Sequence, residues 1–305
     1  MMKRILATAA LACALLSTAE ARADLNIFAC EPEWAVLAKE LGGDKVSIYA
    51  ATNGLQDPHQ VQARPGLIAR ARSADLMVCT GAELEIGWLP VLLRQAGNPR
   101  IQPGMPGFFE ASAHVRLLDV PTRLDRADGD VHAAGNPHIQ TSPKNIRAVA
   151  TALGKRMQEL DRAEAPAIAQ RTESFLARWD EATRRWENAA APLRGTNIAV
   201  AHKNWTYLTT WLGLIEALAL EPKPGIAPGP AYLAQVLADV PAKSVRAVIY
   251  AAYEDARAAE YISQQARIPS VALPFTVGGT DAARDLFGLF DDTVARLTAA
   301  YARKS

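Results

Sequence analysis

The chain has 305 residues, 50% of them apolar, and a formal net charge of +1 at pH 7. This length can bury one large core or two medium ones, so two lobes are a reasonable expectation. The near-neutral charge and the lack of long acidic or basic runs argue against a nucleic-acid partner.

The N-terminus has the three parts of a secretory signal peptide. Met1–Arg4 supplies a positive start, Ile5–Ala19 an apolar run, and Ala21–Ala23 an A-x-A cleavage site. The run is shorter than the roughly 20 residues that span a membrane. A buried N-terminal helix and a lipoprotein anchored at Cys13 are the alternatives. We expect residues 1–23 to be removed, no later segment to span a bilayer, and the mature protein to be periplasmic.

Two cysteines remain in the expected mature chain, Cys30 and Cys79, and each follows a short apolar run. If the runs Leu25–Ala29 and Leu76–Val78 are neighbouring parallel strands, the two sulfurs could meet. An exported protein with two cysteines favours a disulfide, and two buried free thiols are the alternative. A cysteine metal site is not indicated, because there is no CxxC motif and no third cysteine beside these two.

The first half of the mature chain alternates strand-like and helix-like stretches. Glu31-Pro32 opens a helix whose apolar face includes Trp34 and Leu41, and Gly42-Gly43 ends it. Alternation of this kind predicts a parallel sheet covered by helices. The expected strands are Leu25–Ala29, Val46–Ala50, Leu76–Cys79 and Val115–Val120, and the further helices are Leu67–Ala71 and Trp88–Gln95.

The middle of the chain has a purely helical pattern. Apolar residues recur at spacings of three and four from Ile146 to Leu160, and again from Ile168 to Trp186. Pro166 is tolerated if it lies in the first turn of the second helix. That helix would have about 25 residues and a length of about 35–40 Å, which predicts a rigid strut between two lobes.

Strand and helix patterns then alternate again. The fold class is therefore α/β, with two βα lobes, each a mainly parallel sheet with flanking helices, joined by one long rigid helix. The expected boundaries are 1–23 for the signal peptide, 24–160 for the N-terminal lobe, 161–194 for the linking helix and 195–305 for the C-terminal lobe. The expected strands here are Asn197–Ala201, Ala247–Ala251 and Ser270–Leu273, the expected helices are Trp205–Leu214 and Asp281–Ala300, and Glu221–Pro230 is a loop.

Three of the five histidines occupy the same kind of position in this pattern. His59 and His138 each follow a proline in a loop, and His202 directly follows a predicted strand. In open α/β sheets, ligands bind beyond the carboxyl ends of the strands. A structural role is the better interpretation of any one histidine, but three such positions in two lobes predict a metal site.

A closed tetrahedral site needs a fourth ligand, and Asp281 is the candidate. It follows the last predicted strand and Gly278-Gly279, which allow a close approach of the backbone. Its alternative role is that of a helix N-terminal residue. Three imidazoles and one carboxylate suit one Zn²⁺ per chain, whereas manganese prefers more oxygen ligands; copper and nickel could also bind. His132, in the loop 125–134, is either a transient metal carrier or a solvated histidine.

Short blocks around these residues resemble the substrate-binding proteins of zinc and manganese ABC importers, the ZnuA/TroA type. The resemblance covers nearly the whole mature chain and looks closest to the AztC-like zinc-binding branch. The blocks are Asp57-Pro58-His59 with Arg64-Pro65-Gly66, Ala74-Asp75-Leu76, Asn136-Pro137-His138 with Pro143-Lys144-Asn145, Val200-Ala201-His202 with Trp205–Leu208, and Thr276–Asp281.

The resemblance implies a periplasmic zinc-binding protein that is not an enzyme and that delivers metal to the membrane permease of an ABC importer. It implies His59 and His138 as ligands from the first lobe, and His202 and Asp281 from the second. A monomer, with a periplasmic zinc metallochaperone as a further partner, also fits it. The chain departs from many zinc members in its short loop before His138, which contains His132 as its only histidine.

Several other functions are alternatives to a zinc-binding protein of this type. A manganese-binding protein of the same type is the nearest alternative. A zinc-dependent hydrolase with three histidines and an open fourth position is the main alternative of another class, but HExxH and GxSxG motifs are absent from the sequence. A binding protein for an organic ligand, with structural histidines, and an adhesin-like role are the remaining ones.

Overall fold

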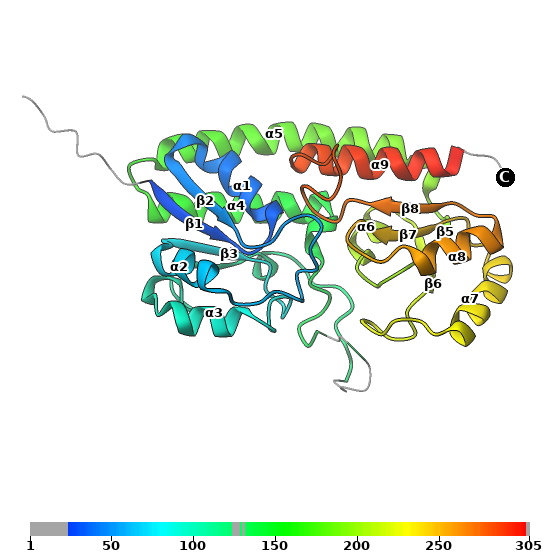
Figure 1. The fold of residues 1–305 in the computed structure, drawn as a ribbon. Helices are drawn as coiled ribbons and strands as arrows, with labels where there is room; N and C mark the ends of the chain where they lie inside the picture. The colour runs from blue at the N-terminus through cyan, green and yellow to red at the C-terminus, as the bar shows by residue number, and fades with distance from the viewer. Residues whose placement is uncertain (1–23, 124–128, 130–131, 303–305) are drawn as a thin grey trace, which may run out of the picture.

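The computed structural model describes residues 24–123, 129 and 132–302 (Figure 1). The predicted signal peptide, residues 1–23, lies outside this range. Among the described residues, every helix is too short or too polar to cross a lipid bilayer.

The N-terminal half contains a sheet of four parallel strands in the order β2-β1-β3-β4. Alternate residues of β1 face opposite sides: Ile27 packs with α1, α4 (Pro143–Leu160) and α5 (Ala165–Ala190), and Phe28 packs with α2 and α3. Figure 1 shows these two helical layers on either side of the sheet. The elements are β1 (Leu25–Ala29), α1 (Pro32–Gly42), β2 (Val46–Ala50), α2 (Pro65–Ser73), β3 (Leu76–Cys79), α3 (Leu89–Ala96) and β4 (Phe108–Glu110).

The first three strands have the predicted bounds, but the fourth prediction is wrong. The segment Val115–Val120 forms no strand, and β4 is the shorter run Phe108–Glu110, in which Phe109 is buried and pairs with Val78. In the expected strand, the backbone N–H of Leu118 donates to the hydroxyl of Tyr207 instead of to a neighbouring strand.

Two long helices follow, α4 (Pro143–Leu160) and α5 (Ala165–Ala190). The 26 residues of α5 confirm the predicted long helix, and Pro166 lies in its first turn. Its apolar stripe is buried along the whole length, from Ile168 to Trp186. The first half of α5 packs against α1 and α4, while the indole N–H of Trp186 donates to Asp291 of α9, at 2.6 Å. In Figure 1, α5 therefore runs over both halves of the molecule.

The C-terminal half repeats the topology of the first, with four parallel strands in the order β6-β5-β7-β8. The predicted fold class is confirmed; the domain boundaries stay a prediction. The edge strand β6 and the helices α7 and α8 were not expected, and α9 begins only at Leu286, five residues after Asp281. The elements are β5 (Asn197–Val200), α6 (Thr206–Leu212), β6 (Ile215–Ala219), α7 (Pro230–Ala242), β7 (Val248–Ala251), α8 (Arg257–Ala266), β8 (Ser270–Leu273) and α9 (Leu286–Ala302).

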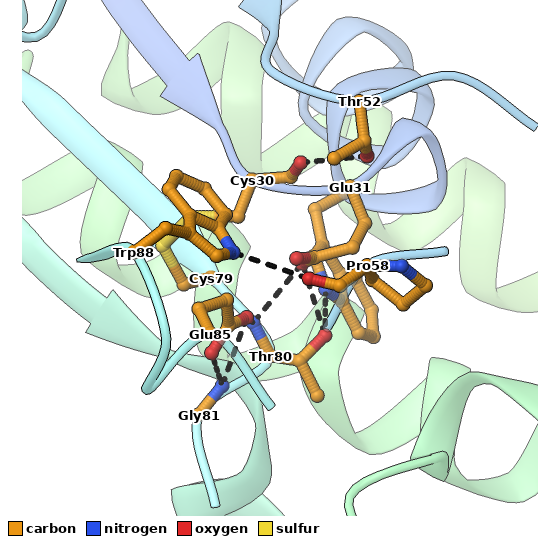
Figure 2. The surroundings of a disulfide bond; sticks show 10 residues. Cys30, Glu31, Thr52, Pro58, Cys79, Thr80, Gly81, Glu85 and Trp88 are labelled. Carbon is orange, nitrogen blue, oxygen red and sulfur yellow. Dashed lines mark hydrogen bonds between the residues drawn. A yellow bond between two sulfur atoms is a disulfide. The ribbon is translucent and has the colours of Figure 1, made fainter. Parts of the chain in front are cut away.

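A disulfide joins Cys30 and Cys79 at the carboxyl ends of the adjacent strands β1 and β3, as predicted (Figure 2). Both cysteines are fully buried. A carboxylate oxygen of Glu85 lies within 4.8 Å of both sulfurs, but the bond between the sulfurs leaves neither of them as a thiolate that could bind a metal.

Candidate metal centre

Four histidines from loops of both halves gather where the strands of the two sheets end. The ring centroids of His59 and His138 are 5.4 Å apart, those of His138 and His202 are 5.8 Å apart, and those of His59 and His202 are 6.4 Å apart. His132 joins them, with its Nε2 atom 3.4 Å from Nε2 of His59. The structure thus brings the three predicted histidine ligands together and adds His132 to the cluster.

The loops that carry His59 and His138 are built in the same way. The Oδ1 atom of Asp57 accepts hydrogen bonds from the backbone N–H and from Nδ1 of His59, both at 2.9 Å. The Oδ1 atom of Asn136 accepts the same pair from His138, at 3.0 and 2.8 Å. In each Asx-Pro-His sequence, the first side chain therefore closes the turn and orients the imidazole two residues later. Because these oxygens only accept, Nδ1 carries the proton of the neutral imidazole in each case, which leaves the lone pair on Nε2.

The loop before His59 is also fixed by a hydrogen bond from the core of the N-terminal half. The indole N–H of Trp88, which is buried, donates to the carbonyl of Pro58 at 3.1 Å. Figure 2 shows this contact beside the disulfide and the buried carboxylates of Glu31 and Glu85. The backbone that presents His59 is thus fixed by the core of the N-terminal half.

His202 follows β5, and its acidic partner, Glu221, follows the neighbouring strand β6. Its Nδ1 lies 2.6 Å from Oε2 of Glu221, which also accepts from the backbone N–H of Gly225. All three predicted ligands therefore have Nδ1 held by an oxygen, which is the usual support of a metal-binding imidazole. The residues that provide it, Asp57, Asn136 and Glu221, were not predicted as site residues. The Asx-Pro-His repeat was a readable signal for the first two, whereas nothing in the Pro/Gly-rich loop marked Glu221.

His138 has the most distinctive environment in the cluster. It is only 2% exposed, and within the described residues its Nε2 atom has no hydrogen-bond partner. Burial, followed by the charges of His59, His202 and His132, holds its pKa well below the usual value for histidine. A buried, neutral imidazole with an unused lone pair is the form in which histidine binds a metal ion.

The pKa values of two groups around the other histidines are shifted by their partners. Burial alone would lower the pKa of His202, but the hydrogen bond and charge of Glu221, with smaller contributions from other carboxylates, raise it above its usual value. Burial alone would raise the pKa of Asp57, but the hydrogen bonds from His59 lower it overall. A metal ion must therefore displace a proton from His202 near neutral pH, while Asp57 remains ionised.

Asp281 is exposed and lies in the turn between β8 and α9. Its main-chain carbonyl accepts from Nε of Arg284 at 2.9 Å. The alternative role of a helix N-terminal residue is wrong, because α9 begins at Leu286. The loops of Asp281 and His59 do touch: a Cβ atom on Gly54 would lie 2.2 Å from the carbonyl carbon of Gly278. The structure thus brings the two loops together without joining the carboxylate to the imidazoles.

Comparisons with known proteins identify the family of the chain. Residues 27–300 match the family described as "Zinc-uptake complex component A periplasmic". Among curated proteins, the metal ABC transporter substrate-binding lipoprotein ScbA of Streptococcus cristatus is 23% identical over 163 residues, or 52% of this chain and 49% of ScbA. The manganese ABC transporter substrate-binding lipoprotein PsaA of Streptococcus pneumoniae is 25% identical over 127 residues, or 40% of each chain. The chain thus spans half the length or less of these curated relatives.

Solved structures share the fold over nearly the whole chain. A crystal structure of ZnuA has a TM-score of 0.77 at 20% identity and covers 91% of this chain and 99% of that one. FpvC from Pseudomonas aeruginosa, in complex with Mn²⁺, has a TM-score of 0.77 at 20% identity and covers 92% of this chain and 99% of that one. At this identity the likeness shows the fold alone.

The family match confirms the resemblance to the ZnuA type and the prediction that the chain is not an enzyme; the AztC-like branch stays a prediction. The relatives differ in the metals that their names give, which include manganese and iron. With a family match over residues 27–300 and the same two-sheet fold, this chain belongs to the periplasmic zinc-uptake component A family.

Proposed function

We propose that this chain is a periplasmic zinc-binding protein that captures one Zn²⁺ with His59, His138, His202 and Asp281. The observation that carries the proposal is the buried Nε2 lone pair of His138, which has no hydrogen-bond partner among the described residues. The ring of His138 lies 5.4 and 5.8 Å, between centroids, from those of His59 and His202, whose Nδ1 atoms are also held. Leaving a buried polar atom unpaired costs about 1–3 kcal/mol, and a bound cation would remove this penalty.

The donor set favours zinc over manganese. Three imidazole nitrogens and one carboxylate oxygen match the tetrahedral coordination of zinc, whereas manganese suits sites with more oxygen ligands. The carboxylates nearest the histidines, those of Asp57 and Glu221, accept hydrogen bonds from imidazoles and are thereby engaged as supports. A manganese-binding protein of the same type remains the alternative, and it requires one of these carboxylates to leave its histidine for the metal.

The fourth ligand and the route of entry complete the proposal. Asp281, which is exposed, would reach the metal by a rearrangement of the turn 278–285, whose start already lies against Gly54. We further propose that the mature protein is a monomer that takes zinc from a periplasmic metallochaperone and delivers it to the membrane permease of an ABC importer. The family and the names of the relatives support the partnership with an importer.

His132 is proposed as the carrier that passes zinc into the site, since its Nε2 lies 3.4 Å from that of His59. The variant His132→Ala should take up zinc from a donor chelator several-fold more slowly, while its equilibrium affinity stays within about twofold of the wild type. Stopped-flow transfer from a coloured chelator measures the rate. An unchanged rate would leave His132 as an ordinary loop residue.

The affinity for zinc should fall with decreasing pH, and the decline should begin above pH 6.5. The raised pKa of His202 means that its proton competes with the metal already at near-neutral pH. The variant Glu221→Gln removes the charge that raises this pKa, so the onset of the decline should move to lower pH. Chelator competition from pH 5.5 to 8.5, with one zinc bound per chain at the upper end, measures this. No saturable zinc binding at pH 8 would refute the proposed function, and identical pH profiles would refute the assignment of Glu221.

A further inference from the structure

The loop that carries His138 is fastened to the C-terminal half of the molecule, although it follows the N-terminal sheet in the sequence. The hydroxyl of Tyr207, in α6, donates to the carbonyl of Asn136 at 2.6 Å and accepts from the backbone N–H of Leu118 at 3.0 Å. The N–H of Asn136 donates in turn to the carbonyl of Leu118 at 2.8 Å. One buried hydroxyl thus binds the backbone at both ends of the segment 118–136.

The side chain of Asn136 connects the ring of His138 with the backbone next to His202. Its Oδ1 atom holds the ring of His138, as described above, while its Nδ2 atom donates to the carbonyl of Lys203 at 3.1 Å. Lys203 directly follows His202. The buried amide of Asn136 therefore spans from the imidazole of one proposed ligand to the backbone beside the next, and its orientation is fixed at both ends.

A carboxylate of the same loop stabilises this amide. Oδ2 of Asp119 accepts from Nδ2 of Asn136 at 3.1 Å and from the hydroxyl of Thr206, the first residue of α6, at 2.7 Å. Asp119 has φ of +50°, in the left-handed region that non-glycine residues seldom adopt. That conformation is unfavourable for a residue with a Cβ atom, and it persists where surrounding contacts enforce it.

We propose that Tyr207 is a positioning residue for metal binding: its hydroxyl fixes His138 to the C-terminal half, so that His138 and His202 form one preformed half of the site. His59 then supplies its ligand from the N-terminal half. This inference rests on the proposed metal site. It adds that His138, although it follows the N-terminal sheet in the sequence, belongs to the C-terminal half of the site together with His202. Preorganised ligands bind more tightly because no ordering of the loop accompanies binding.

The test is the variant Tyr207→Phe in the full mature protein, which removes the hydroxyl and keeps the buried ring. We expect about 10-fold weaker zinc binding, the lower end of the range seen when residues that support metal ligands are altered. The visible spectrum of the Co²⁺-loaded protein, which reports ligand geometry, should also change. Tyr261→Phe, on the exposed face of α8 with Tyr261 42% exposed, is the matched control and should leave both readouts unchanged.

A second variant separates loss of the hydroxyl from a general folding defect. Asp119→Ala cuts the same connection at an exposed side chain and should also weaken zinc binding and change the Co²⁺ spectrum. Wild-type affinity and spectrum in Tyr207→Phe, while His138→Ala loses binding, would overturn this inference and leave the proposed function standing. Equal metal binding by the wild type and His138→Ala would overturn the proposed function itself.

Discussion

Replacing His138 with alanine should lower the affinity for zinc by about 70-fold to about 900-fold. Structural zinc sites bind with about 10–16 kcal/mol, so one of four ligands contributes about 2.5–4 kcal/mol. His138 is buried in the cluster, and its Nε2 atom has no hydrogen-bond partner among the described residues, so its lone pair is available to the metal. Competition against a chelator of known affinity at pH 8 measures the loss.

His114→Ala is the matched control. His114 is exposed and stacks on Phe109, with ring centroids 4.7 Å apart, outside the cluster. It should bind zinc like the wild type. If His138→Ala and His114→Ala bound equally well, the histidine cluster would not be the metal site.

The metal-free variant provides a second readout. The pKa of His138 is lowered in the folded state, so between pH 6.5 and that lower pKa the unfolded chain binds more protons than the folded one. The contribution of His138 to the stability of the metal-free wild type should therefore fall as the pH drops below 6.5. His138→Ala should remove this contribution and show a shallower loss of stability in urea unfolding.

Gly54→Ala should weaken zinc binding by at least about 10-fold and destabilise the fold by about 1–3 kcal/mol, the usual effect of overpacking. The added Cβ would lie 2.2 Å from the carbonyl carbon of Gly278 and 2.4 Å from the nitrogen of Gly279. Because both are backbone atoms, neither can rotate away, and the loop of His59 must separate from the loop of Asp281. Chelator competition and urea unfolding measure the two effects.

Gly66→Ala is the control for this substitution. Gly66 lies in the first turn of α2, and a Cβ there would meet nothing within 4 Å. Its alanine variant should match the wild type in zinc affinity and be equally or slightly more stable. Equal zinc affinity in Gly54→Ala and Gly66→Ala would show that the contact of the two loops does not contribute to the site.

The sequence predicted several elements whose patterns are local. Leu76–Cys79 is a continuous apolar run bounded by polar residues, and α5 repeats its apolar stripe over about five turns, so both were recognised. β4 was missed because three residues carry almost no pattern; its pairing with β3 is a tertiary effect. β6 was missed because Ile215–Ala219 contains glutamate, leucine and two alanines, which favour a helix as much as an edge strand.

The candidate site was predictable to a similar degree. Proline and strand-end positions were sufficient to select His59, His138 and His202, which the structure brings together. The role of Glu221 depends on the packing of β6 beside β5, which no local pattern revealed. The place of His132 in the cluster likewise depends on how its loop folds back, and the sequence left that open.

X-ray absorption at the zinc edge, on the mature protein loaded with one equivalent, tests the central claim most directly. We predict about three nitrogen ligands at 2.0–2.1 Å with imidazole scattering, one oxygen at 2.0–2.2 Å and no sulfur. The imidazole scattering should fall by about a third in His138→Ala. A first shell of oxygen atoms alone, without imidazole scattering, would contradict the account.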